Sequence, residues 1–442
     1  MLMAILIETR IAGVPFPGDF ALVFGRVARP ICSVIISAKN EAERIEACFD
    51  SLGQQRTKFS FEVILVDNGS SDGTFSLASK LAREYKNFRV FRERQPGSAS
   101  ARNLGARRAR GDILLFTDAD CRLSKTWIQE MAKPLLAESS YPLAAVGGRT
   151  VSEFAKPERP TLVERYLDQL FDFWERDRLA AFPAFLPWAP TCNFAVRREI
   201  FLGLGGFDGR WKNAAYDVDF CWRLVLCGFV LGYAPKAEVR HLRRSSLRGL
   251  LRQMENYAFY NQSLLATYEK LLELPRVRAR QERLLGRGRR ALGLVKSTRN
   301  FRQATFRGLD VLSLASGVKG ALQSRVFRIV PNPRFHPTRQ GRTPPELEKR
   351  LSPGYLHLHR NGWCYWKDSP AVGEPGDLIL YRPRRGERFR LNSTAWRIWD
   401  VKAQRGQSED AAVALGQSSD DPLVLRDIDE LTLDLRTRRL LP

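Results

Sequence analysis

The sequence predicts a doubly wound α/β sheet, followed by a helical basic segment and a small α+β domain. Three observations support this fold class. The chain has 442 residues, enough for roughly three domains. Short apolar runs alternate with helical patterns between residues 30 and 120, as in parallel strands joined by helices. Basic residues then dominate from 275 to 342, where the only acids are Glu282 and Asp310, and the composition normalises beyond about residue 351.

Apolar, β-branched runs predict the strands of the first half, at residues 31–36, 61–66, 88–91 and 113–117. Three helices separate them: one capped by Asn40 to about residue 54, one from Ser70 or Ser71 to about residue 85, and one from Ser98 to about residue 110. Ligands bind such sheets at the carboxyl ends of the strands. Residues 145–245 are less regular, and residues 247–272 keep the spacing of an amphipathic helix.

The tail of the chain predicts a separate module. Strand patterns cover residues 355–358, 378–381 and 389–391, and helical patterns cover 394–402, 408–415 and 424–435. Prolines between residues 331 and 345 indicate a linker before it. We therefore expect a leader or edge strand at 1–29, a doubly wound domain at 30–245, a basic helical segment with a linker at 246–345, and a tail domain at 346–442.

Charge and cysteine content narrow the class of protein. The formal net charge of +23 indicates an anionic partner such as a nucleotide, a phosphate, an acidic lipid or nucleic acid. The seven cysteines are scattered without CxxC spacing, which disfavours a disulfide framework or a thiolate zinc site and favours the cytoplasm. No apolar run is long enough to span a bilayer, and the apolar start lacks the features of a signal peptide.

Two carboxylates, Asp118 and Asp120, follow the strand predicted at 113–117. If the chain stays extended, both lie on one face. Close carboxylates repel unless a cation or a proton lies between them, and their hard oxygens suit Mg²⁺ or Mn²⁺ holding a diphosphate. The alternative interpretation is a solvated turn at the end of the strand.

Other polar residues fall on the same edge of the predicted sheet. Asp67 ends the second strand and can accept hydrogen bonds from a base or ribose, although a capped turn explains part of this segment. Ser37 and Asn40 follow the first strand. Small residues and Arg102 open the helix at 98–110, and a helix N-terminus with a guanidinium favours a diphosphate. An ordinary surface arginine is the alternative.

Two candidates come later in the chain. Asp217, within the segment YDVDFCWR at 216–223, could act as a general base. His241 could be a third metal ligand, or a histidine of the surface or the core.

Four pieces in a fixed order carry a resemblance to a known family: Ala38–Glu41, VDNGSSDGT at 66–74, ARNLG at 101–105 leading to TDAD at 117–120, and GGFD at 205–208 followed by YDVDFCWR. Across about residues 30–270 the sequence resembles family 2 glycosyltransferases of the GT-A fold. The resemblance implies a mixed sheet with a Rossmann-like nucleotide-binding half. It also implies an inverting enzyme that uses a UDP- or GDP-sugar and Mg²⁺ or Mn²⁺.

Matching positions in the family imply roles for single residues. Asp217 takes the place of the catalytic base, and Asp118 and Asp120 form the DXD element, with Asp120 nearest the metal and His241 as a further ligand. We expect donor contacts from Ser37, Asn40, Asp67, Asn68, Arg102 and Asp118, and acceptor-side contacts from Asn193, Asp219 and Arg223. The sequence departs from the family pattern where Asn68 replaces an Asp and Tyr216 replaces the Glu of a Glu-Asp pair. These departures put the contact to the base, and acceptor binding or the pKa of Asp217, in question.

The segment Arg390–Trp399 resembles PqqD-like domains, small winged-helix modules that bind precursor peptides by adding a strand to a sheet edge. A strand is expected to end at Leu391, and Asn392 or Ser393 to cap a helix with Trp396 and Trp399 on one face. The alternative is a helical cap that stabilises the rest of the chain.

The basic segment has an imperfect apolar side, formed by Leu309, Leu312, Ala315, Leu322, Val326 and Ile329 and flanked by Arg307, Lys319, Arg325 and Arg328. This pattern predicts peripheral contact with an anionic membrane on its inner face. A solvated helical linker is the alternative, and no motif supports nucleic-acid binding.

The sequence thus predicts an inverting, metal-dependent glycosyltransferase acting on a lipid-linked, polysaccharide or peptide acceptor. Two alternatives stay open. One is an inactive glycosyltransferase-like scaffold that binds peptide or membrane, and the other is a nucleotidyltransferase, which shares carboxylates at strand ends.

Overall fold

A computed structural model describes residues 29–137, 141–171, 179, 186–272, 301–326, 351–367, 377–383 and 385–441. Nearly all of the predicted leader at 1–29, and the parts of the basic segment at 273–300 and 327–350, lie outside these residues. None of the described helices is both long and apolar enough to cross a membrane.

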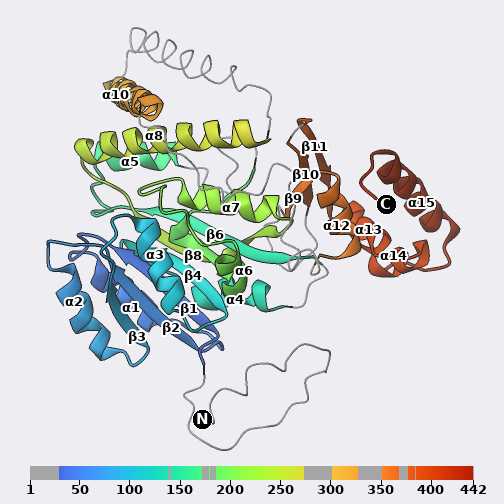
Figure 1. Cartoon of the computed structure of the whole chain (residues 1–442), viewed down its shortest axis with the longest axis horizontal. Coiled ribbons are helices and arrows are strands. Elements are labelled where there is room, and N and C mark those ends of the chain that lie inside the picture. Colours follow the sequence, from blue (N-terminus) through green and yellow to red (C-terminus); the bar gives the residue numbers. More distant parts are fainter. Residues whose placement is uncertain are drawn as a thin grey trace, which may run out of the picture.

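The centre of the protein is an eight-stranded mixed sheet of order β3-β2-β1-β4-β7-β6-β8-β5 (Figure 1). Strands β1 to β4 are parallel, as predicted, and β7 runs antiparallel between β4 and β6. The strands are β1 (Cys32–Ala38), β2 (Phe61–Asp67), β3 (Phe88–Arg92), β4 (Ile113–Asp118), β5 (Cys121–Leu123), β6 (Leu143–Glu153), β7 (Phe194–Arg197) and β8 (Val230–Leu242).

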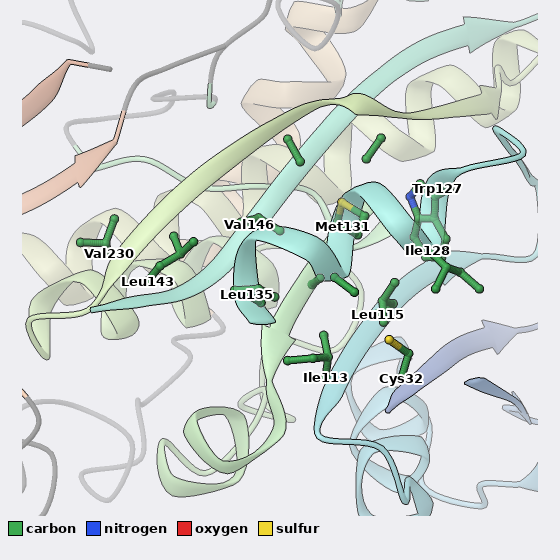
Figure 2. Packing of buried hydrophobic residues seen from close by; sticks show 14 of the residues in the cluster. Cys32, Ile113, Leu115, Trp127, Ile128, Met131, Leu135, Leu143, Val146 and Val230 are labelled. Atoms are coloured by element: carbon green, nitrogen blue, oxygen red, sulfur yellow. The ribbon is translucent and has the colours of Figure 1, made fainter. Parts of the chain in front are cut away.

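Helices cover both faces of the sheet, because successive side chains of a buried strand point to opposite sides. Val34 and Ile36 of β1 belong to one buried cluster with helices α1 (Ile45–Gly53), α2 (Thr74–Leu81) and α4 (Trp127–Leu136). Ile35 belongs to another with α3 (Ser98–Arg108), α6 (Arg198–Gly203) and α7 (Tyr216–Leu226). Figure 2 shows α4 packed on the sheet through its apolar side chains. The predicted doubly wound α/β fold is therefore confirmed.

Two predicted helix starts are wrong. Asn40 does not cap α1, which begins at Ile45; its backbone is left-handed, with φ of 58°, and its side-chain oxygen accepts a hydrogen bond from the Ser71 amide at 2.9 Å. Helix α2 begins at Thr74, whose amide donates to Asp72 at 3.0 Å, rather than at Ser70 or Ser71, and the short 3-10 helix η1 (Ala82–Glu84) follows it. Residues 39–44 and 68–73 thus form loops at the sheet edge.

A further helical layer lies over α7: α5 (Leu162–Leu170), α8 (Leu247–Leu272) and α10 (Phe301–Val326) (Figure 1). Helix α8 matches the predicted amphipathic helix. Small residues allow α10 to lie close to α8, since a Cβ at Gly320 would meet the Glu255 carbonyl oxygen at 2.1 Å. Leu309 is buried against α5 and α8, whereas Leu312, Val318 and Leu322 stay exposed. The predicted apolar side of the basic segment is therefore divided between the core and the surface.

The tail forms a small three-stranded antiparallel sheet of order β11-β10-β9, from β9 (Cys364–Lys367), β10 (Leu378–Arg382) and β11 (Glu387–Leu391). Its helices are α12 (Pro353–Arg360), α13 (Ser393–Ala403), α14 (Ser408–Ala414) and α15 (Pro422–Thr437). Asn392 caps α13 through the Ala395 amide, as predicted. The predicted strand at 355–358 is wrong, because residues 353–360 form α12, which opens with a proline in its first turn.

The tail packs directly on the central sheet domain. The Tyr365 hydroxyl donates to the Gly228 carbonyl oxygen at 2.6 Å, just past the end of α7. Cys364, Trp366 and Ile379 share a buried cluster with α7. The tail module therefore adjoins the helix that carries Asp217.

Candidate active site

The carboxyl ends of β1, β2 and β4 meet at one edge of the sheet, as predicted. The strand register places Ser37 beside Asp118 and Ala38 beside Asp67. Three of the predicted donor-binding residues are therefore brought together by the strands themselves. Asn40 lies in the exposed loop after β1, joined to the loop after β2.

Asp67 and Asn68 have different roles in the structure. Asp67 is 2% exposed, and its Oδ1 has no hydrogen-bond partner among the described residues, while Oδ2 accepts from the Ser70 amide at 3.4 Å. The side-chain nitrogen of Asn68 donates to the backbone carbonyl oxygens of Glu93 and Gln95. Its side-chain oxygen accepts a hydrogen bond from the backbone amide of Gly97 at 2.7 Å. An aspartate could not donate these bonds. Asn68 therefore organises the loop before α3, and Asp67 is left as an acceptor.

Arg102 joins two parts of the site. It is 2% exposed in α3, and its guanidinium forms an ion pair with Asp118 and donates from Nη1 to the Tyr216 hydroxyl at 2.8 Å. Its Nε has no hydrogen-bond partner among the described residues. The predicted alternative of an ordinary surface arginine is wrong. A buried cation with an unused donor fits an anionic ligand such as a diphosphate.

The carboxylates of Asp118 and Asp120 do not share one strand face. Asp118 ends β4, and residues 119–120 form a turn before β5, so the chain does not stay extended, which was the condition for a shared face. This turn brings Asp120 to the neighbouring β8: the register pairs Cys121 with His241, and His241 Nε2 lies 3.7 Å from Asp120 Oδ1. Asp120 and His241, both predicted as metal ligands, thus lie close together.

The residues at this edge fit a divalent cation. One ligand atom from each of Asp120, Cys121 and His241 lies within 4.8 Å of the others. Burial raises the pKa of the Cys121 thiol well above its ordinary value, and a thiol is a poorer ligand than a thiolate. The carboxylate and the imidazole are thus the better candidates. Asp118, which forms an ion pair with Arg102, does not belong to this group of ligand atoms.

Sequence reasoning left one acidic residue of this edge without a role. The pKa of Glu41 is raised to about 7, mainly by burial and secondly by the negative charge of Asp120. Asp118 adds to this effect, whereas Arg44, which bonds Glu41 at 2.7 Å, lowers it. Three carboxylates therefore crowd here, which again favours a cation. The segment Ala38–Glu41 was a motif in the sequence, but its glutamate gave no separate signal.

Asp217 opens α7 near Arg102. Ala215, which precedes the first residue of α7, has a left-handed backbone with φ of 66°. The backbone amide of Val218 donates a hydrogen bond to Asp217 Oδ1 at 2.9 Å. Burial raises the pKa of its carboxyl to about 6, while that backbone bond and the positive charge of Arg102 act in the opposite direction. Such a carboxyl is well placed to exchange protons near neutral pH.

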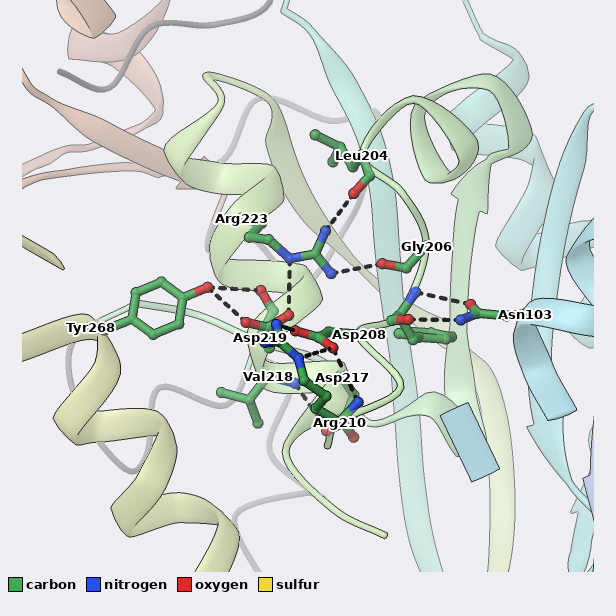
Figure 3. A network of polar contacts seen from close by, with 11 residues as sticks. Asn103, Leu204, Gly206, Asp208, Arg210, Asp217, Val218, Asp219, Arg223 and Tyr268 are labelled. Atoms are coloured by element: carbon green, nitrogen blue, oxygen red, sulfur yellow. Dashed lines mark hydrogen bonds and ion pairs between the residues drawn. The ribbon is translucent and has the colours of Figure 1, made fainter. Parts of the chain in front are cut away.

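The three predicted acceptor-side residues are buried supports, and Figure 3 shows two of them, Asp219 and Arg223. Asn193, in the short 3-10 helix η3 (Thr191–Asn193), is fully buried, accepts from Trp127 Nε1 and donates to the Arg149 and Ala237 carbonyl oxygens. Arg223 pairs with Asp219 at 2.9 Å and also donates to two carbonyl oxygens of the loop 204–206. Breaking a buried pair of this kind costs about 3–5 kcal/mol. We therefore assign these residues no acceptor contact.

Comparison with known proteins agrees with this geometry. The family model described as Glycosyl transferase family 2 matches residues 33–204, and that described as Coenzyme PQQ synthesis protein D matches residues 377–441. Glycosyltransferase AglE of Haloferax volcanii is 31% identical over 229 residues, which cover 50% of this chain and 71% of AglE. The chain therefore belongs to glycosyltransferase family 2, with a PqqD domain at its C-terminal side.

A second relative is matched over less than half of its own length. Pre-mycofactocin glycosyltransferase of Mycobacterium tuberculosis is 27% identical over 232 residues, covering 52% of this chain and 46% of that protein. Among solved structures, mannosyltransferase PcManGT from Pyrobaculum calidifontis, in complex with GDP-Man and Mn²⁺, aligns with a TM-score of 0.40 and 19% identity, covering 69% of this chain and 78% of that chain.

Proposed function

We propose that the protein is an inverting, metal-dependent glycosyltransferase that moves a sugar from a nucleoside-diphosphate sugar to an acceptor hydroxyl. The observation that carries this proposal is the bridge made by Arg102, which joins Asp118 of the DXD element to the residue preceding Asp217. The groups that would bind a diphosphate thus lie close to the carboxylate that would accept a proton.

The donor half of the site follows from the unused polar atoms. Asp67 Oδ1 is a buried acceptor suited to the nucleoside, and Ser37 lies on the neighbouring strand. Arg102 would meet the diphosphate, and Asp120 with His241 would hold Mg²⁺ or Mn²⁺. When bound, the cation would neutralise negative charge on the departing diphosphate.

The acceptor half needs a base. The acceptor oxygen attacks the anomeric carbon from the face opposite the diphosphate, and its proton passes to the Asp217 carboxylate. The bond from the anomeric carbon to the diphosphate oxygen breaks, and the nucleoside diphosphate leaves with the bonding electrons. A single displacement inverts the anomeric configuration, and Arg102 stabilises the developing charge.

The pH dependence of transfer should report the Asp217 carboxyl. Because the base must be deprotonated and its pKa is raised to about 6, we expect kcat/KM to fall below about pH 6, roughly tenfold for each pH unit. Initial rates from pH 4.5 to 8 at saturating metal test this. A plateau that continues down to pH 4.5 would contradict the assignment of the base.

The proposed function is tested by a donor screen. Purified protein, Mn²⁺ and a panel of UDP- and GDP-sugars are incubated with candidate peptides and lipid carriers, and products are identified by mass spectrometry and their anomers by NMR. Transfer with release of nucleoside diphosphate and inversion supports the proposal. Release of pyrophosphate would indicate a nucleotidyltransferase, and no turnover of any donor would indicate a scaffold.

We also propose that the tail domain binds a peptide. Strand β11 lies at one edge of the three-stranded sheet, so one side of it is not covered by another strand of that sheet. An extended peptide can add a strand to such an edge. Because the tail packs beside α7, a bound peptide would lie on the domain that adjoins the catalytic helix. The peptide acceptors in the donor screen test this proposal.

A peripheral contact with an anionic membrane, on its inner, cytoplasmic face, is a third proposal. The exposed Leu312, Val318 and Leu322 of α10 lie within a segment whose sequence is strongly basic. We expect co-sedimentation with phosphatidylglycerol vesicles that weakens with salt and falls several-fold in Leu322→Asp. Leu433→Asp, at an exposed position on α15, is the matched control. Equal binding to neutral phosphatidylcholine vesicles, or no binding at low salt, would contradict this role.

A further inference from the structure

Tyr216 occupies the position next to the proposed base and has a defined set of contacts. Its hydroxyl accepts a hydrogen bond from Arg102 Nη1 at 2.8 Å and lies 3.3 Å from Thr191 Oγ1. Its ring packs edge-on against Phe207, with centroids 5.3 Å apart. Only 7% of the residue is exposed. Packing and two polar partners therefore fix the place of the phenol oxygen.

The orientation of Arg102 depends on two contacts. One is the ion pair with Asp118 and the other is the bond to Tyr216. A guanidinium is a planar fork, so one contact leaves it free to turn about that contact, whereas two contacts set its plane. Asp118 is itself partly exposed, with 26% of its side chain accessible, whereas Tyr216 is buried.

The phenol also keeps the local charge low. Burial raises the pKa of Tyr216 above its ordinary value, so the hydroxyl stays neutral. Asp118 is then the only anion that the described residues place in an ion pair with Arg102. The guanidinium therefore keeps attraction for a further anion, and its Nε still has an unused proton.

We propose that Tyr216 is a positioning residue, which acts through Arg102 and holds its guanidinium in the orientation that binds the donor diphosphate. The inference rests on the proposed function, because it takes the diphosphate as the ligand of Arg102. It gives a physical role to the position where this chain has a phenol rather than an acid.

The test uses the full chain and calorimetric titration with UDP and with GDP, each in the presence of Mn²⁺. We expect Tyr216→Phe to bind the preferred nucleotide about tenfold more weakly, the usual size of a lost bond to a charged group. Tyr166→Phe is the matched control: it also removes a hydrogen bond of a buried tyrosine, the partly buried bond to Asp310 at 2.9 Å, but on α5. Thermal denaturation of both variants separates a loss of folding from a loss of binding.

A double-mutant cycle shows whether Tyr216 acts through Arg102. If it does, Tyr216→Phe should have little further effect on nucleotide affinity in an Arg102→Met background. Additive effects, or wild-type affinity in Tyr216→Phe alone, would overturn the inference while leaving the proposed function intact. If the unmodified protein binds neither UDP nor GDP with Mn²⁺, both proposals fail.

Discussion

Replacement of Asp217 by Asn is expected to lower transfer by about 10²–10⁴-fold, the usual contribution of a general base. The amide keeps the size of the side chain and can still accept from the Val218 amide, so the start of α7 should not change. In the proposed mechanism, donor binding depends on groups on other elements, namely Arg102 and Asp120. We therefore expect the affinity for the nucleotide with Mn²⁺ to stay near that of the unmodified protein.

Initial rates and calorimetry on the same preparation measure both quantities. Asp427→Asn, at an exposed position on α15, controls for the change of charge. Loss of nucleotide affinity in Asp217→Asn would move this residue to the donor site. Unchanged transfer would remove it from the mechanism.

Replacement of Asp120 by Ala is expected to have the second large effect. Removing one preorganised charge-stabilising group typically lowers kcat by about 10²–10³-fold. Asp120 lies 3.7 Å from His241, so its loss leaves the imidazole as the main remaining ligand. Mn²⁺ should then no longer raise the affinity for UDP or GDP, and hydrolysis of the donor should fall with it.

The matched control for this variant is Asp50→Ala. Asp50 is an exposed aspartate in the last turn of α1. Titration of nucleotide with and without Mn²⁺ measures the effect. If Asp120→Ala kept a full response to the metal, Asp120 would not be a ligand, and the grouping of the carboxylates at this edge would need another explanation.

Three strands of the first half, β1, β2 and β4, were predictable because each is a short apolar run buried on both faces. Strand β3 is a partly buried edge strand, and its alternating aromatic and valine residues still predicted it. Strands β1, β2, β3 and β4 lie within two residues of their predicted bounds. Helix starts were harder, since they depend on contacts between loops. Asn40 looks like a cap in the sequence, but the loop after β2 holds it in a left-handed turn instead.

Short aromatic segments in the tail were also ambiguous. Residues 355–358 are three apolar or aromatic side chains and one histidine, yet they form a helix whose large buried side chains, Tyr355 and Leu358, are three positions apart. Strand β9 is buried along its whole length, so it lacks the alternation that would have predicted it.

The order of polar residues along the chain predicted where the candidate site lies. The contacts within this site join residues far apart in the sequence, so the sequence did not predict them. Arg102 and Tyr216 are 114 positions apart, and only the packing of α3 against the start of α7 joins them. Asp219 and Arg223 are charged residue types that usually lie on the surface. In the structure both are buried, and Arg223 donates hydrogen bonds to the loop 204–206. Burial of this kind follows from neighbours that no local pattern records.

The most direct test of the account is an anomalous diffraction map, recorded at the manganese edge from crystals grown with Mn²⁺ and UDP or GDP. We predict one strong peak bounded by Asp120 and His241, with the nucleotide diphosphate between that peak and Arg102. A manganese peak elsewhere, or a nucleotide bound away from Arg102 without metal, would contradict the proposal that this edge of the sheet holds a metal-bound sugar donor.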